Sequence, residues 1–484
     1  MIDLDLVYAA YQAEEEETRQ KNIIVARNYY AGEQNTKMSK RQQEFIGYNL
    51  ANERFAINYC APVVDAVVER MIVSGFLSDD EVYAAWCWDV WEYNRMDAKQ
   101  RGTHQQAVNE VEAFVAVDWP KEDDMPTFTP YPRYTDRELD GGTGFGCKAH
   151  YVENDPNQEL EAISKRWYET YRDEKDQDKV RERMNIYFPN RIERYIAVTE
   201  GRYRDSGWRP FADDDGEAVV PWTTAGVAGG KPLGIPIAPI RKPGAFELWD
   251  AIPLQDLINK TALDIIATAD ACGFPIRLTY NWMATTDGKA PEDGGGNYLS
   301  MTPGAWVAVR PDGGADASTD VLPPADLIPM LAALDSYIMK LAQVTDTPAA
   351  RFQITGQIAA EGTLKQQEGP LLAKVRAYKT LIGNGWENLF TITRNLAATH
   401  GTTFTDDVTV EAQWEPSETR DEKVELETLM LKQGLGVTRE MLWAEMGYDQ
   451  DEIAMMKAQS AEELQEQSNI GGVLLRQFEQ GGVV

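Results

Sequence analysis

The longest hydrophobic pattern lies in the second half of the chain and predicts a helix over residues 363–399. Apolar side chains recur there at spacings of three, four or seven residues, which places them on one helical face. They are Leu364, Leu371, Val375, Tyr378, Ile382, Trp386, Leu389 and Leu396. Such a helix would be roughly 55 Å long. Pro370 lies near its start and lacks a backbone N–H, so we expect a kink or a break there.

Two helices of similar length are predicted before it, over residues 254–272 and 327–344. The insert between them contains short β-like runs at 276–280 and 306–309 among Gly-rich turns. We therefore expect an antiparallel helix pair joined at one end by a small α+β lobe. The small and polar residues 345–362 that follow are typical of a loop.

The first half mixes shorter elements. Hydrophobic spacing predicts helices over residues 3–31, 60–71 and 96–111 and a strand over 113–117. Trp86, Trp88 and Trp91 are expected in a core. Three further predictions are a loop over 118–146, an α/β segment over 147–198 with a charged surface at 172–183, and extended chain over 232–240. The C-terminal part adds a strand over 408–414 and amphipathic helices over 418–479.

Composition is that of a globular protein with several units: 484 residues, 43% hydrophobic and 26% charged. No run of 18 apolar residues exists, and the first residues lack the pattern of a secretory signal, so we expect no membrane span. Cys60, Cys87, Cys147 and Cys272 lie far apart. This spacing argues against a disulfide scaffold or a zinc knuckle and favours buried thiols.

The net charge of −31 excludes a static DNA-binding protein, because such proteins neutralise phosphates with basic surfaces. It is compatible with a conduit in which DNA must slide without strong contacts, and also with a charge that only maintains solubility. The sequence contains no GxxxxGK[ST], HExxH or GxSxG motif, and its three histidines are scattered. We therefore expect no catalytic residue, no metal and no cofactor.

Several short strings, in order along nearly the whole chain, resemble the portal family of tailed bacteriophages in its Gp6-like branch. They include Tyr29 to Gly32, Asn58 to Asp65, and Ile186 to Ile192. The strings from Pro232 to Ile240 and from Ile252 to Lys260 resemble the family's proline-flanked strand and its "LQD-x-x-NK" helix. Glu361 to Lys365 is similar to the start of its long helix, although Glu-Gly-Thr stands where Ser-Gly is more usual.

The resemblance implies an α+β, mainly helical portal fold with a long kinked helix. Its parts would be a wing at 1–245, stem helices at 246–272 and 324–345 around a clip at 273–323, a tunnel loop at 345–362, the long helix with a wing strand at 363–414, and a crown at 415–484. The resemblance also implies a ring of twelve subunits at one capsid vertex, assembled in the host cytoplasm. Its partners would be double-stranded DNA, the terminase, head-completion or adaptor proteins, and the major capsid or scaffold protein.

Within the tunnel loop, Arg351, Gln353, Thr355 and Gln357 are the candidates to face DNA. Arg351 is the only basic residue between Lys340 and Lys365, so one ring of isolated positive charges would result. The alternative is an ion pair of Arg351 with Asp346 or Glu361. We expect Phe352 to pack against the long helix rather than to stack on bases.

In the clip, Trp282, Tyr298 and Trp306 are candidates for docking partner proteins, because aromatic residues are favoured at interface centres. They could instead fill the core of this small lobe. Two other functions stay open: a soluble enzyme whose site is built from scattered carboxylates, and another acidic scaffold of a phage structure.

Overall fold

The computed structural model describes most of the chain, in segments that divide into two compact units. The larger unit contains residues 1–24, 64–246 and 361–484, and the smaller contains 25–63 and 247–360. The described residues are 20–34, 55–120, 125–133, 145–152, 159–172, 178–198, 208–212, 217–227, 229–273, 277–280, 306–308, 318–321, 326–352, 361–405, 408–417, 429–446, 448, 450 and 452–460.

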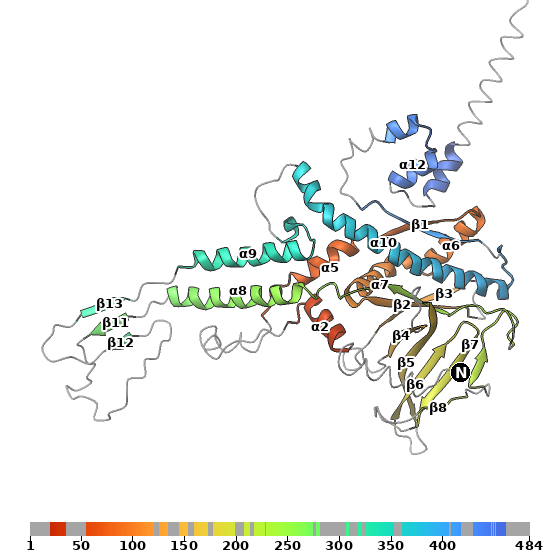
Figure 1. The fold of residues 1–484 in the computed structure, drawn as a ribbon, viewed down its shortest axis with the longest axis horizontal. Coiled ribbons are helices and arrows are strands. Elements are labelled where there is room, and N and C mark those ends of the chain that lie inside the picture. Colours follow the sequence, from red (N-terminus) through yellow and green to blue (C-terminus); the bar gives the residue numbers. More distant parts are fainter. Residues whose placement is uncertain are drawn as a thin grey trace, which may run out of the picture. The chain divides into compact units, whose positions relative to one another are not determined.

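The smaller unit is built on two antiparallel helices, α8 (Ala251–Gly273) and α9 (Ile328–Val344), which lie side by side (Figure 1). Between them in sequence come β11 (Arg277–Tyr280), β12 (Trp306–Ala308) and β13 (Ser318–Val321). Strand β11 is central, parallel to β12 and antiparallel to β13. The predicted helix pair with a strand-containing insert is therefore confirmed. Helix α2 (Gln20–Tyr30) is the described part of the predicted first helix.

Helix α10 (Glu361–Ala397) is continuous through Pro370, so a break at this position is ruled out. Pro370 is exposed, so water can bond the carbonyl that the missing N–H leaves free. Just before it, Glu368 pairs with Arg70 at 3.1 Å. Most of the predicted apolar stripe that is described is buried, and this packing outweighs the local cost of one proline. The buried residues are Leu371, Val375, Ile382, Trp386, Leu389 and Leu396, and Tyr378 is half-buried.

An aromatic core joins α10 to helices α6 (Glu81–Tyr93) and α7 (Met96–Glu110) in the larger unit. The rings of Phe76 and Phe390 lie 4.5 Å apart, and those of Trp91 and Trp386 lie 5.0 Å apart. Trp88 and Trp91 are buried as expected, whereas Trp86 is half-buried. Helix α5 (Cys60–Val68) precedes this region and spans the sequence boundary between the two units.

A two-stranded ribbon of β1 (Val73–Leu77) and β14 (Glu411–Trp414) also belongs to this unit. Side chains hydrogen-bond to backbone groups of this ribbon that a further strand would otherwise bind. On β1, the Val73 and Phe76 amides donate to the Gln100 and Gln450 side chains. On β14, Glu387 accepts from the Ala412 amide and Lys379 donates to the Glu415 carbonyl. Strand β1 had no counterpart among the sequence predictions.

Two antiparallel β-sheets also belong to the larger unit. One sheet has the order β10-β2-β3, and the other has β4-β5-β6-β7-β8 with β9 paired to β7. Their bounds are β2 (Glu112–Asp118), β3 (Thr127–Pro132), β4 (Phe145–Tyr151), β5 (Leu160–Arg172), β6 (Asp178–Tyr187), β7 (Arg191–Ala197), β8 (Trp208–Pro210), β9 (Val219–Pro221) and β10 (Ile237–Arg241). The predicted strand at 113–117 and the extended chain at 232–240 are confirmed.

Two predictions fail here. The described residues of 147–198 contain strands and the turns between them but no helix, so they are not an α/β segment, and β3 lies in the expected loop at 118–146. The larger sheet has apolar side chains on both faces, which obscures the alternation that marks a strand. The expected charged surface at 172–183 is also partly buried, because neighbouring strands pair Arg166 with Glu182 and Arg183 with Glu169.

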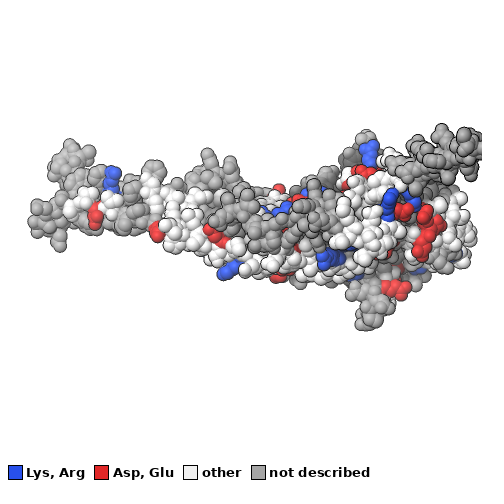
Figure 2. Space-filling model, turned by 90° about the horizontal axis from the view of Figure 1, so that it is seen from above, with Lys and Arg blue, Asp and Glu red and all other residues white. Residues whose placement is uncertain are grey.

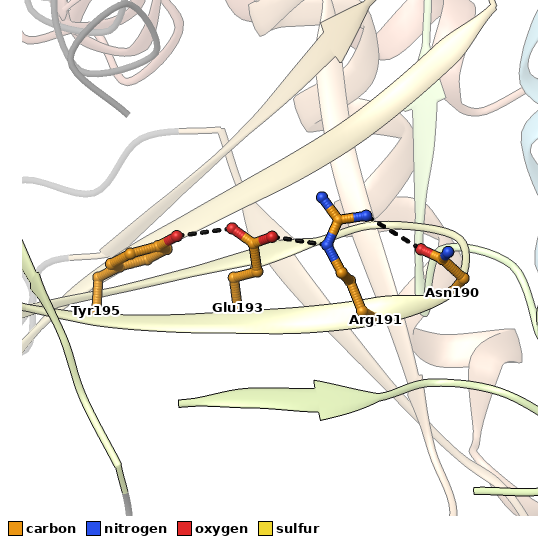
Figure 3. Close-up of polar contacts among 4 residues, drawn as sticks. All are labelled: Asn190, Arg191, Glu193 and Tyr195. Atoms are coloured by element: carbon orange, nitrogen blue, oxygen red, sulfur yellow. Dashed lines mark hydrogen bonds and ion pairs between the residues drawn. The ribbon is translucent and has the colours of Figure 1, made fainter. Parts of the chain in front are cut away.

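Strand β7 carries a row of polar side chains on one face (Figure 3). Arg191, Glu193 and Tyr195 point the same way because strand residues alternate. The Arg191 Nε and the Tyr195 hydroxyl each donate to the Glu193 carboxylate at 2.6 Å, and Arg191 also reaches Asn190 Oδ1 at 3.3 Å. These donors compensate the burial of the Glu193 charge.

The described C-terminal residues are helical at 429–434, in α12 (Arg439–Met446) and at 452–460. The predicted helices of this region, and the stop at residues 434–436, are confirmed as far as they are described. Two short 3₁₀ turns, η2 (Ala349–Arg351) and η3 (Ala398–His400), flank α10 in the sequence.

Candidate functional site

Two buried amide side chains on α8 hold the segment before α5. Gln255 and Asn259 are one helical turn apart and therefore share a face. Gln255 Oε1 accepts from the Tyr59 amide at 2.9 Å, and its Nε2 donates to the Ile57 carbonyl. Asn259 Oδ1 accepts from the Ile57 amide at 2.9 Å, and its Nδ2 donates to Gln34. The two amides thus take the place of a neighbouring strand for residues 57–59.

The same segment is tied to the end of α2. Asn58 Nδ2 donates to the Tyr30 carbonyl at 2.8 Å, while its Oδ1 accepts from the Cys60 amide at 3.1 Å and so caps α5. The Tyr29 hydroxyl donates to Asp256 at 2.7 Å. Burial and this hydrogen bond raise the pKa of Tyr29. Gln255, Asp256 and Asn259 therefore all form hydrogen bonds with residues between positions 29 and 59.

The chain leaves α9 in a defined conformation. The Thr345 hydroxyl donates to the Leu341 carbonyl at 2.8 Å, and the Thr347 amide donates to the Ala342 carbonyl at 3.0 Å. Asp346 between them has a left-handed backbone with φ of 54°, a conformation that asparagine and aspartate tolerate better than most residues. Both threonines are buried. This helix end therefore directs residues 348–352 along one path.

Arg351 closes the turn η2, and its side chain is exposed. Its amide donates to the Pro348 carbonyl at 2.9 Å, and the Phe352 amide donates to the Ala349 carbonyl at 3.0 Å. The Phe352 ring packs edge to face on Tyr59, with centroids 5.6 Å apart and planes at 81°. Phe352 was expected to pack on the long helix; the contact that the structure gives it is with Tyr59.

Most of the other predicted site residues lie in parts of the chain that the structure does not describe. Gln353, Thr355 and Gln357 lie outside the described residues, as do Trp282 and Tyr298. Trp306 begins β12, next to Arg277 of β11. Among these candidates, the structure describes the side chain of Arg351 alone. Sequence reasoning did not assign a role to Tyr59, Gln255 or Asn259, although the strings that contain them carried the family resemblance.

Charged side chains do not form an extended basic surface on the face drawn in Figure 2, as far as its residues are described. Basic and acidic groups there are interspersed among uncharged ones. No cluster of three His, Cys, Asp or Glu suited to a metal ion occurs in the described segments. Within the same segments, no helix combines the length and apolar character that crossing a membrane requires.

The histidines are engaged in packing. His104 is buried, with Nδ1 2.9 Å from the Met71 carbonyl and Nε2 accepting from the Trp386 indole at 3.0 Å. Burial lowers the pKa of His104 to about 4. His150 contacts the Ser164 hydroxyl at 2.9 Å, and His400 stacks on Trp119 with ring centroids 4.5 Å apart. These three side chains lie on different elements and do not share a site.

The sequence matches the family model described as "Phage portal protein, SPP1 Gp6-like" over residues 10–468. This match covers nearly the whole chain, and the chain therefore belongs to the Gp6-like phage portal protein family. No curated protein matches the sequence. The family is structural rather than enzymatic, and membership supports a portal role at a capsid vertex.

Proposed function

We propose that copies of this chain form a closed ring of twelve subunits at one capsid vertex, through which double-stranded DNA is packaged and later ejected. In this ring α8 and α9 are the stem, residues 273–323 the clip, and residues 345–362 the tunnel loop. The wing is formed by residues 1–245 with α10 and β14, and the crown by residues 415–484. Identical subunits around a channel must meet through two different surfaces, head to tail.

The exposed apolar face of α9 is the observation that carries the ring proposal. Ile328, Leu331 and Met339 fall on one face of the helix, with the exposed Asp335 among them, and are 73%, 47% and 40% exposed in the single subunit. Apolar groups of this size are costly in water when they are grouped on one surface. A neighbouring copy placed beside the stem would cover them.

The charge of the chain supports its role as a conduit. A net charge of −31 repels DNA over most of a subunit, so a duplex in the channel meets few sites that would hold it. Arg351 contributes one positive charge per subunit at the level of the tunnel loop. Such a ring of arginines contacts phosphates briefly, while the clip docks the terminase first and head-completion proteins later.

Electron microscopy of the purified full-length protein tests this proposal, combined with its native mass. Rings with a central hole and a mass of twelve subunits are expected. A variant with Ile328, Leu331 and Met339 all changed to Ser should lose the rings and remain folded, whereas the matched exposed change Val227→Ser in the larger unit should keep them. A monomer at all concentrations would favour a soluble enzyme, and oligomers without a hole would favour another scaffold of the phage particle.

A further inference from the structure

Phe352 lies within the tunnel loop, directly after the turn η2. Phe352 is half-buried and meets the half-buried ring of Tyr59 edge to face, at 5.6 Å between centroids. Edge-to-face pairs of this geometry stabilise an arrangement beyond the area that they bury. The contact joins residues that are far apart in sequence, so it constrains the loop from outside its own segment.

Tyr59 is itself fixed through its backbone. Its amide donates to the buried Gln255 side chain, and both backbone groups of Ile57 are bound by Gln255 and Asn259. The position of the Tyr59 ring therefore follows the position of α8.

On its other side, Phe352 is connected to α9. The bonds of Thr345 and Thr347 fix the helix end, and the turn η2 carries the chain on to Arg351 and Phe352. Phe352 is thus held to α9 through the chain and to α8 through Tyr59. The backbone of Arg351 therefore lies between two fixed points, the end of α9 before it and the contact of Phe352 with Tyr59 after it.

We propose that Tyr59 and Phe352 are positioning residues that anchor the first end of the tunnel loop, with Gln255 and Asn259 holding Tyr59 against α8. The anchor keeps Arg351 at one level along the two helices. The part that it plays in DNA handling rests on the proposed function, whereas the anchor itself can be tested on purified protein.

Trypsin cleavage after Arg351 in the full-length protein measures release of the anchor, because cleavage requires the local segment to open. The variant Tyr59→Ala should raise this rate roughly two- to tenfold, the range expected for losing one aromatic pair. The variant Tyr59→Phe keeps the ring and should match the wild type. Tyr337→Ala removes an aromatic ring from α9 itself and serves as the matched control. Cleavage after Arg439 in the larger unit provides the internal reference.

The variant Phe352→Leu tests the contact from the loop side if Tyr59→Ala does not fold. Its rate is corrected with a synthetic peptide of residues 347–357, because the residue after the cleaved bond has changed. Rates after Arg351 that stay within a factor of two of the wild type in folded Tyr59→Ala and Phe352→Leu would overturn the anchor. An equal increase in Tyr59→Phe would overturn it as well, since the ring pair is retained there.

DNA retention in assembled heads separates the anchor from the proposed function. With both correct, Tyr59→Ala lowers retention several-fold in intact rings, and Tyr59→Phe does not. Faster cleavage in Tyr59→Ala with normal retention in both Tyr59→Ala and Arg351→Ala would uphold the anchor and contradict the role of the loop. Lower retention in Arg351→Ala, with Tyr59→Ala unchanged in cleavage and retention, would contradict the anchor alone.

Discussion

His104 shows how a single polar side chain can be accommodated in an aromatic core. The Trp386 indole donates to Nε2, so Nε2 carries no proton, and Nδ1 donates to the Met71 carbonyl. The ring is therefore a neutral tautomer with both nitrogens paired. Protonation would bury a positive charge, and for this reason burial lowers the pKa of His104 to about 4. A proton on Nε2 would also break the hydrogen bond from Trp386.

Acidification should consequently destabilise the larger unit. In the unfolded chain His104 binds a proton below about pH 6.5, whereas the folded protein binds it only below about pH 4. The contribution of His104 to the free energy of unfolding is complete above pH 6.5. It declines by about 3 kcal/mol as the pH falls to 4. Urea unfolding from pH 4 to 7 should show a weaker pH dependence in His104→Gln than in the wild type. Equal slopes in both proteins would contradict this account.

Arg351 is the residue on which the DNA-contacting role of the loop depends. The change Arg351→Ala should leave rings intact and lower DNA packaging or retention, because one positive charge per subunit is lost where phosphates pass. Arg351→Lys retains the charge and should lie closer to the wild type. If Arg351 instead forms an ion pair with Asp346 or Glu361, ring stability falls first. Intact, stable rings with wild-type packaging and retention would contradict both roles.

Among the elements, α8 is distinguished by the polar face that it turns toward residues 57–59. The change Gln255→Leu leaves the Tyr59 amide and the Ile57 carbonyl without this partner. Leaving a buried polar group unpaired costs about 1–3 kcal/mol, an upper bound for these two partly buried groups. Thermal or urea unfolding should therefore show a clear loss of stability in Gln255→Leu and in Asn259→Leu. The exposed Lys260→Ala on the same helix is the control and should unfold like the wild type.

The insert between α8 and α9 should act as a docking surface. Replacing Trp282 with Ala is expected to weaken binding of the terminase and of head-completion proteins, because aromatic side chains commonly dominate interface energetics. The change Trp306→Ala separates the two roles considered for that ring. Loss of a core ring would lower the stability of the protein, whereas loss of a docking ring would lower partner binding. Trp249, half exposed outside the insert, gives a control variant. Unchanged partner binding by Trp282→Ala would refute the docking role.

For the whole molecule, the net charge of −31 opposes assembly. Every copy added to a ring brings the same sign of charge, so self-repulsion grows as the ring closes. Screening extends over about 10 Å at 0.1 M salt and about 30 Å at 0.01 M. Native mass across a salt series should therefore show fewer complete rings at low salt and more at moderate salt. A monomer at every ionic strength would contradict ring formation.

The sequence by itself determined those elements whose pattern lies within one continuous segment. Helices α8, α9 and α10 and the strands β11 and β12 of the insert were predictable, because helical spacing and glycine-rich turns are read within one segment, whereas β13 was not predicted. Arg351 stood out for a similarly local reason, as the only basic residue between Lys340 and Lys365. The family resemblance also rested on strings of neighbouring residues, and the family match confirms it.

Only the tertiary structure decided which segments pair. Strand β1 is a strand because it pairs with β14, more than 300 residues later in the sequence. The strands at 147–198 carry apolar residues on both faces of their sheet. A helix satisfies its backbone within itself, whereas a strand depends on a partner whose distance in sequence is not encoded locally. The same reason applies to the anchor. Gln255 and Tyr59 are 196 residues apart, and their roles follow only from the fold that brings them together.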